Sequence, residues 1–112
     1  MKVGYISGPY RDRRGVYYIR QNICAAEKAA IELWRAGFAV ICPHKNTALF
    51  DGAAPDEVWL KGDLELIRRS DFVVMIGDWN KSEGACEERR VALSERKRVY
   101  TSIKEAIEWE NR

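Results

Sequence analysis

The chain has 112 residues, of which 46% are hydrophobic and 32% are charged, which is enough for one packed core and too little for two. Its net charge of +2 is too small to indicate a nucleic-acid partner, and no apolar run approaches the roughly 18 residues that a membrane-spanning helix needs. We therefore expect a single domain over residues 1–112, with neither a nucleic-acid polymer nor a membrane as its partner.

Short apolar runs predict strands, and apolar residues that recur every three or four positions predict helices. The expected strands are residues 2–6, 38–42, 72–76 and 98–101. The expected helices are residues 16–35, 55–69, 82–96 and one that begins at 102, while residues 43–54 are expected to form a loop. Because strands and helices alternate, we expect an α/β fold. Its expected form is a small three-layer sandwich of the flavodoxin or Rossmann type, with a parallel sheet of four to five strands.

The three cysteines, Cys24, Cys42 and Cys86, form no C-x-x-C motif. Each lies in a segment that is expected to be a core helix or strand. This placement predicts buried, reduced thiols in a cytoplasmic protein.

Polar and small residues gather where the expected strands end, which is the edge where parallel sheets bind ligands. Gly8 there either lets a ligand approach the backbone or simply marks a turn. Arg11 carries a planar guanidinium that suits phosphate or carboxylate. His44, the only histidine, is either structural or part of a site. No further histidine or spaced cysteine set completes a metal site, and neither a G-x-G-x-x-G motif nor a P-loop is present, so no metal or organic cofactor is expected.

Glu88 is the most informative carboxylate, because Val91 and Ala92 follow it at the spacing of one helix face. A carboxylate on an apolar stripe is costly to bury unless it is paired or used. Arg89 is the alternative inward residue on this helix, although a long arginine side chain can still reach solvent. A solvated Glu88 on a charge-rich helix is the remaining interpretation.

Asp63 is a second carboxylate near an expected apolar stripe, with Leu60 three residues before it and Ile67 four residues after it. It therefore borders the inward face of its helix. Carboxylates on two converging helices suggest acid–base or glycosyl chemistry.

Several short segments recur together, in this order and spacing, in a known family. They are residues 5–11, His44, residues 62–65 with 70–74, and the pattern Ser82-x-Gly84-x-x-x-Glu88 with Ala92. Over nearly its full length the chain resembles the nucleoside 2-deoxyribosyltransferase superfamily. The likeness is greatest to the 2′-deoxynucleoside 5′-phosphate N-hydrolases and to a related group of small uncharacterised bacterial and phage domains.

The resemblance implies a retaining reaction on a nucleoside or nucleotide, in which Glu88 is the nucleophile. Asp63 would assist departure of the base, and Tyr5 would orient Glu88. It also implies a homodimer or a higher homo-oligomer. The residues implied to bind the substrate are Gly8, Arg11, His44, Ser82 and Gly84.

Ser82 bears on the substrate, because the equivalent position in transferases that act on free nucleosides is acidic. A serine at a helix N-terminus instead favours a 5′-phosphate, although serine is also a common N-cap. The leading hypothesis is therefore an N-glycosidase of (deoxy)nucleoside 5′-monophosphates in nucleotide metabolism. A transferase that exchanges bases and a non-catalytic nucleotide-binding module are the alternatives. Glu87 and the pair Arg89-Arg90 depart from the pattern of the hydrolases, which usually carry an aromatic residue and a Leu-Gly or Ile-Gly pair there.

Overall fold

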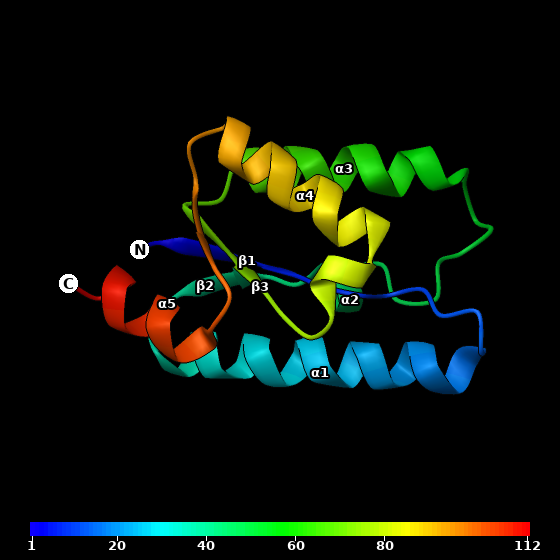
Figure 1. Cartoon of the computed structure of the whole chain (residues 1–112), viewed down its shortest axis with the longest axis horizontal. Helices are drawn as coiled ribbons and strands as arrows, with labels where there is room; N and C mark the ends of the chain where they lie inside the picture. Colours follow the sequence, from blue (N-terminus) through cyan, green and yellow to red (C-terminus); the bar gives the residue numbers. More distant parts are fainter.

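The computed structural model describes residues 1–112 and contains a four-stranded parallel sheet with helices on both sides (Figure 1). This confirms the predicted α/β fold and its parallel sheet. The strand order is β2-β1-β3-β4, so the first strand lies inside the sheet. The strands are β1 (Val3–Ser7), β2 (Ala39–Ile41), β3 (Phe72–Met75) and β4 (Arg98–Tyr100).

The helices begin and end close to their predicted bounds, because the caps and the apolar periodicity are both readable in the sequence. Two short elements were not predicted. The helix α2 (Pro43–Asn46) occupies the start of the expected loop and begins with Pro43, a residue favoured in a first helical turn. The 3₁₀ turn η1 (Trp79–Lys81) lies just before the expected third helix. The helices are α1 (Val16–Arg35), α2 (Pro43–Asn46), α3 (Asp56–Arg68), the 3₁₀ turn η1 (Trp79–Lys81), α4 (Glu83–Ser94) and α5 (Ile103–Glu110).

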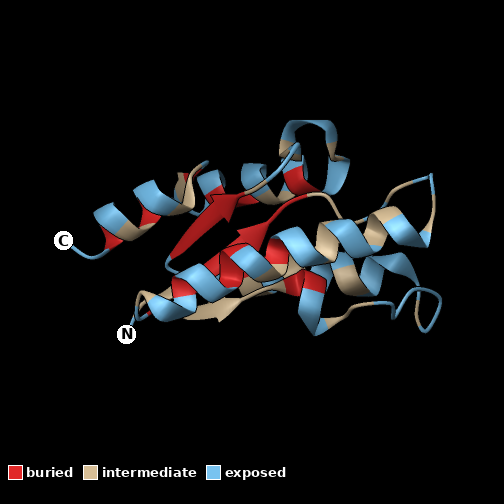
Figure 2. Ribbon diagram, turned by 90° about the horizontal axis from the view of Figure 1, so that it is seen from below, coloured by how far each residue is buried: buried red, intermediate tan, exposed pale blue.

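The strands carry apolar side chains on both faces and so build two cores. Figure 1 shows α1 and α5 on one side of the sheet and α3 and α4 on the other, and Figure 2 shows buried strands between partly exposed helices. Alternation along β1 sends Ile6 toward α1, whereas Tyr5 joins the core beneath α3 and α4. The two hydroxyl-bearing residues of β1, Tyr5 and Ser7, therefore face the layer of α3 and α4.

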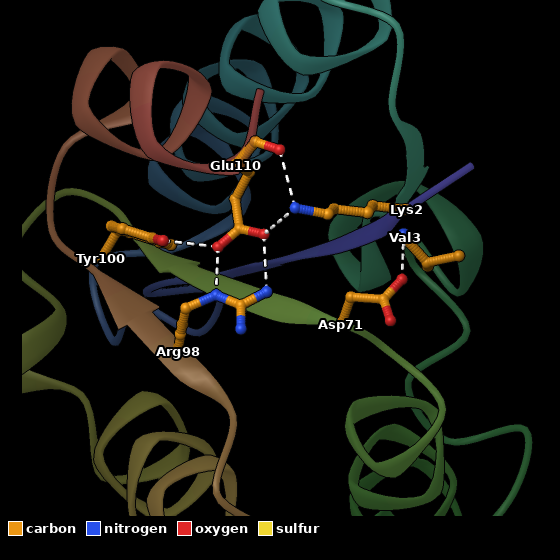
Figure 3. A network of polar contacts seen from close by, with 6 residues as sticks. All are labelled: Lys2, Val3, Asp71, Arg98, Tyr100 and Glu110. Carbon is orange, nitrogen blue, oxygen red and sulfur yellow. Dashed lines mark hydrogen bonds and ion pairs between the residues drawn. The ribbon is translucent and has the colours of Figure 1, made fainter. Parts of the chain in front are cut away.

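A carboxylate network closes the edge of the sheet where the strands begin (Figure 3). Glu110, at the end of α5, is buried and accepts hydrogen bonds from Arg98 Nε at 2.5 Å and Tyr100 Oη at 2.5 Å. Lys2 Nζ adds a contact of 3.2 Å to the same carboxylate. The hydrogen bonds from Arg98 lower the pKa of Glu110 to about 2. This network therefore fixes the last helix against β4 and against Lys2, the residue before β1.

Two expectations about burial are wrong. Cys24 and Cys86 are exposed and Cys42 is partly buried, because the helical cysteines occupy the solvent side of α1 and α4. All three thiols are unpaired. Leu60, expected on the buried stripe of α3, is 54% exposed. None of the helices has the length and apolar character needed to cross a bilayer.

Candidate active site

An open cleft of about 1020 Å³ lies at the ends of the parallel strands. The β1–α1 loop, α2, α3 and the first turns of α4 surround it. All the site residues predicted from the sequence except Tyr5 line this one cleft. Tyr5 lies beneath it and donates a hydrogen bond to Glu88, which does line it. The lining residues among them are Gly8, Arg11, His44, Asp63, Ser82, Gly84 and Glu88.

Glu88 is held by hydroxyl groups from the central strand. Tyr5 Oη donates a hydrogen bond to Glu88 Oε2, and Ser7 Oγ donates one to Oε1 at 2.7 Å. Both donors are fully buried, whereas Glu88 itself is partly buried and lines the cleft. Each carboxylate oxygen therefore has a fixed neutral donor. No cation is paired with this carboxylate, in contrast to Glu110.

The surroundings of Glu88 bring the pKa of its carboxyl group close to neutral pH. Burial raises its pKa to about 7, the hydrogen bonds from Tyr5 and Ser7 act in the opposite direction, and the charge of Asp63 raises it further. Burial and the neighbouring Glu88 carboxylate also raise the pKa of the Tyr5 hydroxyl. Tyr5 consequently stays protonated and serves as a donor.

Asp63 projects from α3 into the same cleft and is partly buried. Burial alone raises the pKa of its carboxyl group to about 6, with no hydrogen bond or ion pair to offset the effect. Its carboxylate is near enough to act on the ionisation of Glu88. A free carboxyl group beside a tethered one is an arrangement that can supply a proton donor and a nucleophile.

The start of α4 forms the other end of the cleft. Ser82 caps the helix, and its Oγ accepts a hydrogen bond from the Ala85 N–H at 3.2 Å. At Gly84 a Cβ atom would meet no protein atom within 4 Å, so packing does not require a glycine there. Lys81, just before the cap, lines the cleft and makes no ion pair, and the sequence analysis did not identify it. Free backbone N–H groups at a helix N-terminus and a nearby cation suit an anionic ligand.

Arg11 also lines the cleft, but it is already bound to another residue. Its guanidinium lies 2.7 Å from the Asp56 carboxylate at the start of α3, and both side chains are exposed. An anionic ligand would therefore share or take Arg11 from Asp56.

Gly8 and His44 both support the loop that follows β1. A Cβ atom on Gly8 would lie 2.6 Å from Ile76 Cγ1, so packing against Ile76, the residue after β3, is enough to explain the absence of a side chain. His44 is buried, and its Nε2 donates to the Pro9 carbonyl oxygen at 2.8 Å. Burial lowers the pKa of His44, which keeps the ring neutral at pH 7. Both residues line the cleft and also hold its wall in place.

The alternative inward residue on α4, Arg89, is exposed, and its guanidinium carbon lies 5.3 Å from the centre of the Trp79 ring. Like Lys81, Ser7 was not identified by the sequence analysis, because the expected strand ended one residue before it. Alternation along β1 could have identified it, because residues 5 and 7 share a face.

Comparisons with known proteins agree with this architecture. Residues 1–101 match the family described as "Domain of unknown function (DUF4406)". No curated protein matches the chain. A solved structure of the 2-deoxyribosyltransferase from the psychrotolerant bacterium Bacillus psychrosaccharolyticus has the same fold, with a TM-score of 0.62 and 21% sequence identity. The likeness covers 87% of this chain and 69% of that one. The chain thus belongs to the DUF4406 family and shares the fold of the 2-deoxyribosyltransferase.

Proposed function

We propose that the protein is an N-glycosidase that hydrolyses the bond between base and sugar in (deoxy)nucleoside 5′-monophosphates. The observation that carries the proposal is the pairing of Glu88, held by two hydroxyl groups, with the unbound carboxyl group of Asp63 in one cleft. The similar fold of a 2-deoxyribosyltransferase supports chemistry at the same bond.

The reaction proceeds in two displacements at the anomeric carbon. An oxygen of ionised Glu88 attacks this carbon, the bond to the base nitrogen breaks, and its electron pair leaves with the base. Asp63 gives its proton to the departing base. Water then attacks the same carbon, Asp63 takes a proton from the water, and Glu88 leaves as a carboxylate. The products are the free base and the sugar 5-phosphate, and no step requires a metal or an organic cofactor.

The other cleft residues bind and orient the substrate in this proposal. Tyr5 holds Glu88 for attack. The phosphate lies at the start of α4, where Ser82 and Gly84 present the helix N-terminus, with Arg11 facing the same cleft.

A substrate panel tests the reaction class. The protein is incubated with nucleosides and with their 5′-monophosphates, with and without a second base, and the released base is measured by chromatography. We expect free base from monophosphates with water as the only acceptor. Product that requires a second base would indicate the transferase. Binding by calorimetry without product from any compound would indicate a non-catalytic module.

Ser82→Asp tests the phosphate site, because a carboxylate there repels a 5′-phosphate while still capping the helix. We expect the ratio of kcat/KM for monophosphates to that for nucleosides to fall by at least about tenfold, since like charges at close range cost more than about 1 kcal/mol. Ser102→Asp is the matched control, because Ser102 caps α5 in the same way through the Glu105 N–H. An unchanged ratio in Ser82→Asp would contradict the assignment of the phosphate site.

A further inference from the structure

Ser7 is the last residue of β1 and is fully buried. Its carbonyl oxygen belongs to the sheet, where it accepts a hydrogen bond from the Ile76 N–H at 2.8 Å. Its hydroxyl group has one protein partner, Glu88 Oε1 at 2.7 Å. Buried hydroxyl groups need a partner, and here the fold provides this one alone. The side chain of Ser7 therefore serves Glu88 rather than the packing of the sheet.

We propose that Ser7 is a positioning residue that fixes the orientation of the Glu88 carboxylate and favours its ionised form. One hydrogen bond, from Tyr5 to Oε2, leaves a carboxylate free to rotate about its last bond. A second bond from Ser7 to the other oxygen fixes the plane of the group. The catalytic meaning of this arrangement rests on the proposed function, whereas the arrangement itself can be tested without it.

Hydroxyl donors suit a carboxylate that must act at neutral pH. A hydroxyl group that donates a hydrogen bond to an ionised carboxylate can turn and accept a hydrogen bond from the O–H of the neutral form, so Glu88 is satisfied in both states. A cation in the place of Ser7 would hold the carboxylate permanently ionised and weaken it as a nucleophile, which is the situation of Glu110 beside Arg98. Ser7 thus favours the ionised form of Glu88 and still allows the carboxyl group to be protonated.

The direct test is an NMR titration of protein labelled with ¹³C at the glutamate carboxyl carbons, in which the Glu88 signal is assigned by its loss in Glu88→Gln. Ser7→Ala removes a donor to the charged form, so we expect the Glu88 midpoint to rise by about one pH unit. Ser70→Ala is the matched control, because Ser70 is equally buried and its Oγ donates to the Leu66 carbonyl oxygen at 2.8 Å. This control should leave the Glu88 midpoint unchanged.

The pH profile of activity gives a second readout. The alkaline limb of kcat/KM should move upward by the same amount as the NMR midpoint, because the Glu88 pKa is the higher of the two and sets that limb, and the maximum of the profile should fall. A shifted NMR midpoint in a protein with no glycosidase activity would support the role of Ser7 and contradict the proposed function.

An unshifted midpoint in folded Ser7→Ala, or an equal shift in Ser70→Ala, would overturn the role of Ser7. If Ser7→Ala does not fold, Ser7→Cys replaces it, since a thiol keeps the volume but donates weakly. Its midpoint should rise by a smaller amount, and a midpoint equal to that of the unsubstituted protein would likewise overturn the proposal.

Discussion

Glu88 and Glu110 lie at opposite ends of the sheet, and each accepts a hydrogen bond from a tyrosine. They differ in the charge of their other partners. Glu110 also binds Arg98 and Lys2, and its pKa falls to about 2, chiefly because of the hydrogen bonds from Arg98. Glu88 has only neutral donors, and burial raises its pKa to about 7. The cations keep Glu110 ionised, so that it stabilises the fold, whereas Glu88, which has no cation beside it, can serve as a reactive group.

The largest expected effect separates the two glutamates by activity. Glu88→Gln removes the nucleophile and should lower kcat by at least about 10³-fold. Glu110→Gln is the matched control and should keep kcat within about twofold, because its partners Lys2 and Arg98 lie where the strands begin, away from the cleft. Release of base from a saturating monophosphate at 20 °C measures both, with circular dichroism to show that each variant is folded. Comparable losses in the two variants would contradict the comparison.

Asp63→Asn should have the next largest effect, a fall in kcat of about 10²-fold, which is at the low end for a general acid. The productive form needs Glu88 ionised and Asp63 protonated, and the group that must be ionised has the higher pKa, about 7 against about 6. The kcat/KM profile should therefore rise to a break near pH 6 and fall beyond a break near pH 7. Asp63→Asn should abolish the decline at high pH. The midpoint of the Glu88 carboxyl in an NMR titration should fall in Asp63→Asn, because the charge of Asp63 raises the pKa of Glu88.

The matched control for Asp63→Asn is Glu65→Gln on the same helix, since Glu65 is exposed and is bound to Arg69 at 3.0 Å. It should leave the pH profile unchanged. A decline at high pH that persists in Asp63→Asn would assign that limb to another group.

The smallest effects are on the free energy of unfolding, and we expect Glu110→Gln and Glu88→Gln to change it in opposite directions. Glu110 has a folded pKa below the ordinary 4.5, so its stabilisation is present above pH 4.5 and is lost as the pH falls toward 2. Glu110→Gln should therefore lower the free energy of unfolding at pH 7 by about 1–3 kcal/mol. Urea unfolding of this variant at several pH values measures the effect. A deficit that did not shrink toward pH 2 would contradict the role of the cations.

Glu88 has a folded pKa above 4.5, so its contribution is full below pH 4.5 and is lost as the pH rises through 7. Glu88→Gln should consequently unfold less readily than the unsubstituted protein above pH 7, by roughly 1–3 kcal/mol. The same urea series compares the two proteins. Equal free energies of unfolding for Glu88→Gln and the unsubstituted protein at pH 8 would show that the ionised Glu88 carboxylate does not destabilise the folded state.

Most of the fold could be predicted from the sequence, because periodicity and caps such as Ser82 are local signals. The helix at residues 16–35 has the predicted bounds. The four-residue helix α2 was missed because it is too short to show a period. The strand order also lay beyond local signals, since it depends on pairing between segments far apart in the chain.

The site was only partly predictable for a similar reason. Glu88 and Asp63 stand out as carboxylates beside apolar stripes, and the structure brings both into the cleft. Gly8 was open to two interpretations, a close approach for a ligand or a turn, and Ser7 lay just outside the expected strand of residues 2–6. Only the tertiary structure shows that Gly8 packs against Ile76 and that Ser7 holds Glu88. Glu110 gave no signal, because a glutamate near the end of a charged helix looks solvated until its partners from β4 and Lys2 are placed.

The position of β1 inside the sheet has a consequence for how the cleft meets its ligand. Its backbone pairs with β2 on one side and β3 on the other, which makes it among the last segments to open in amide hydrogen exchange. The two hydroxyl groups that hold Glu88 are attached to this rigid backbone. The carboxylate is therefore preorganised in the empty protein, and an incoming sugar does not have to supply the energy to orient it.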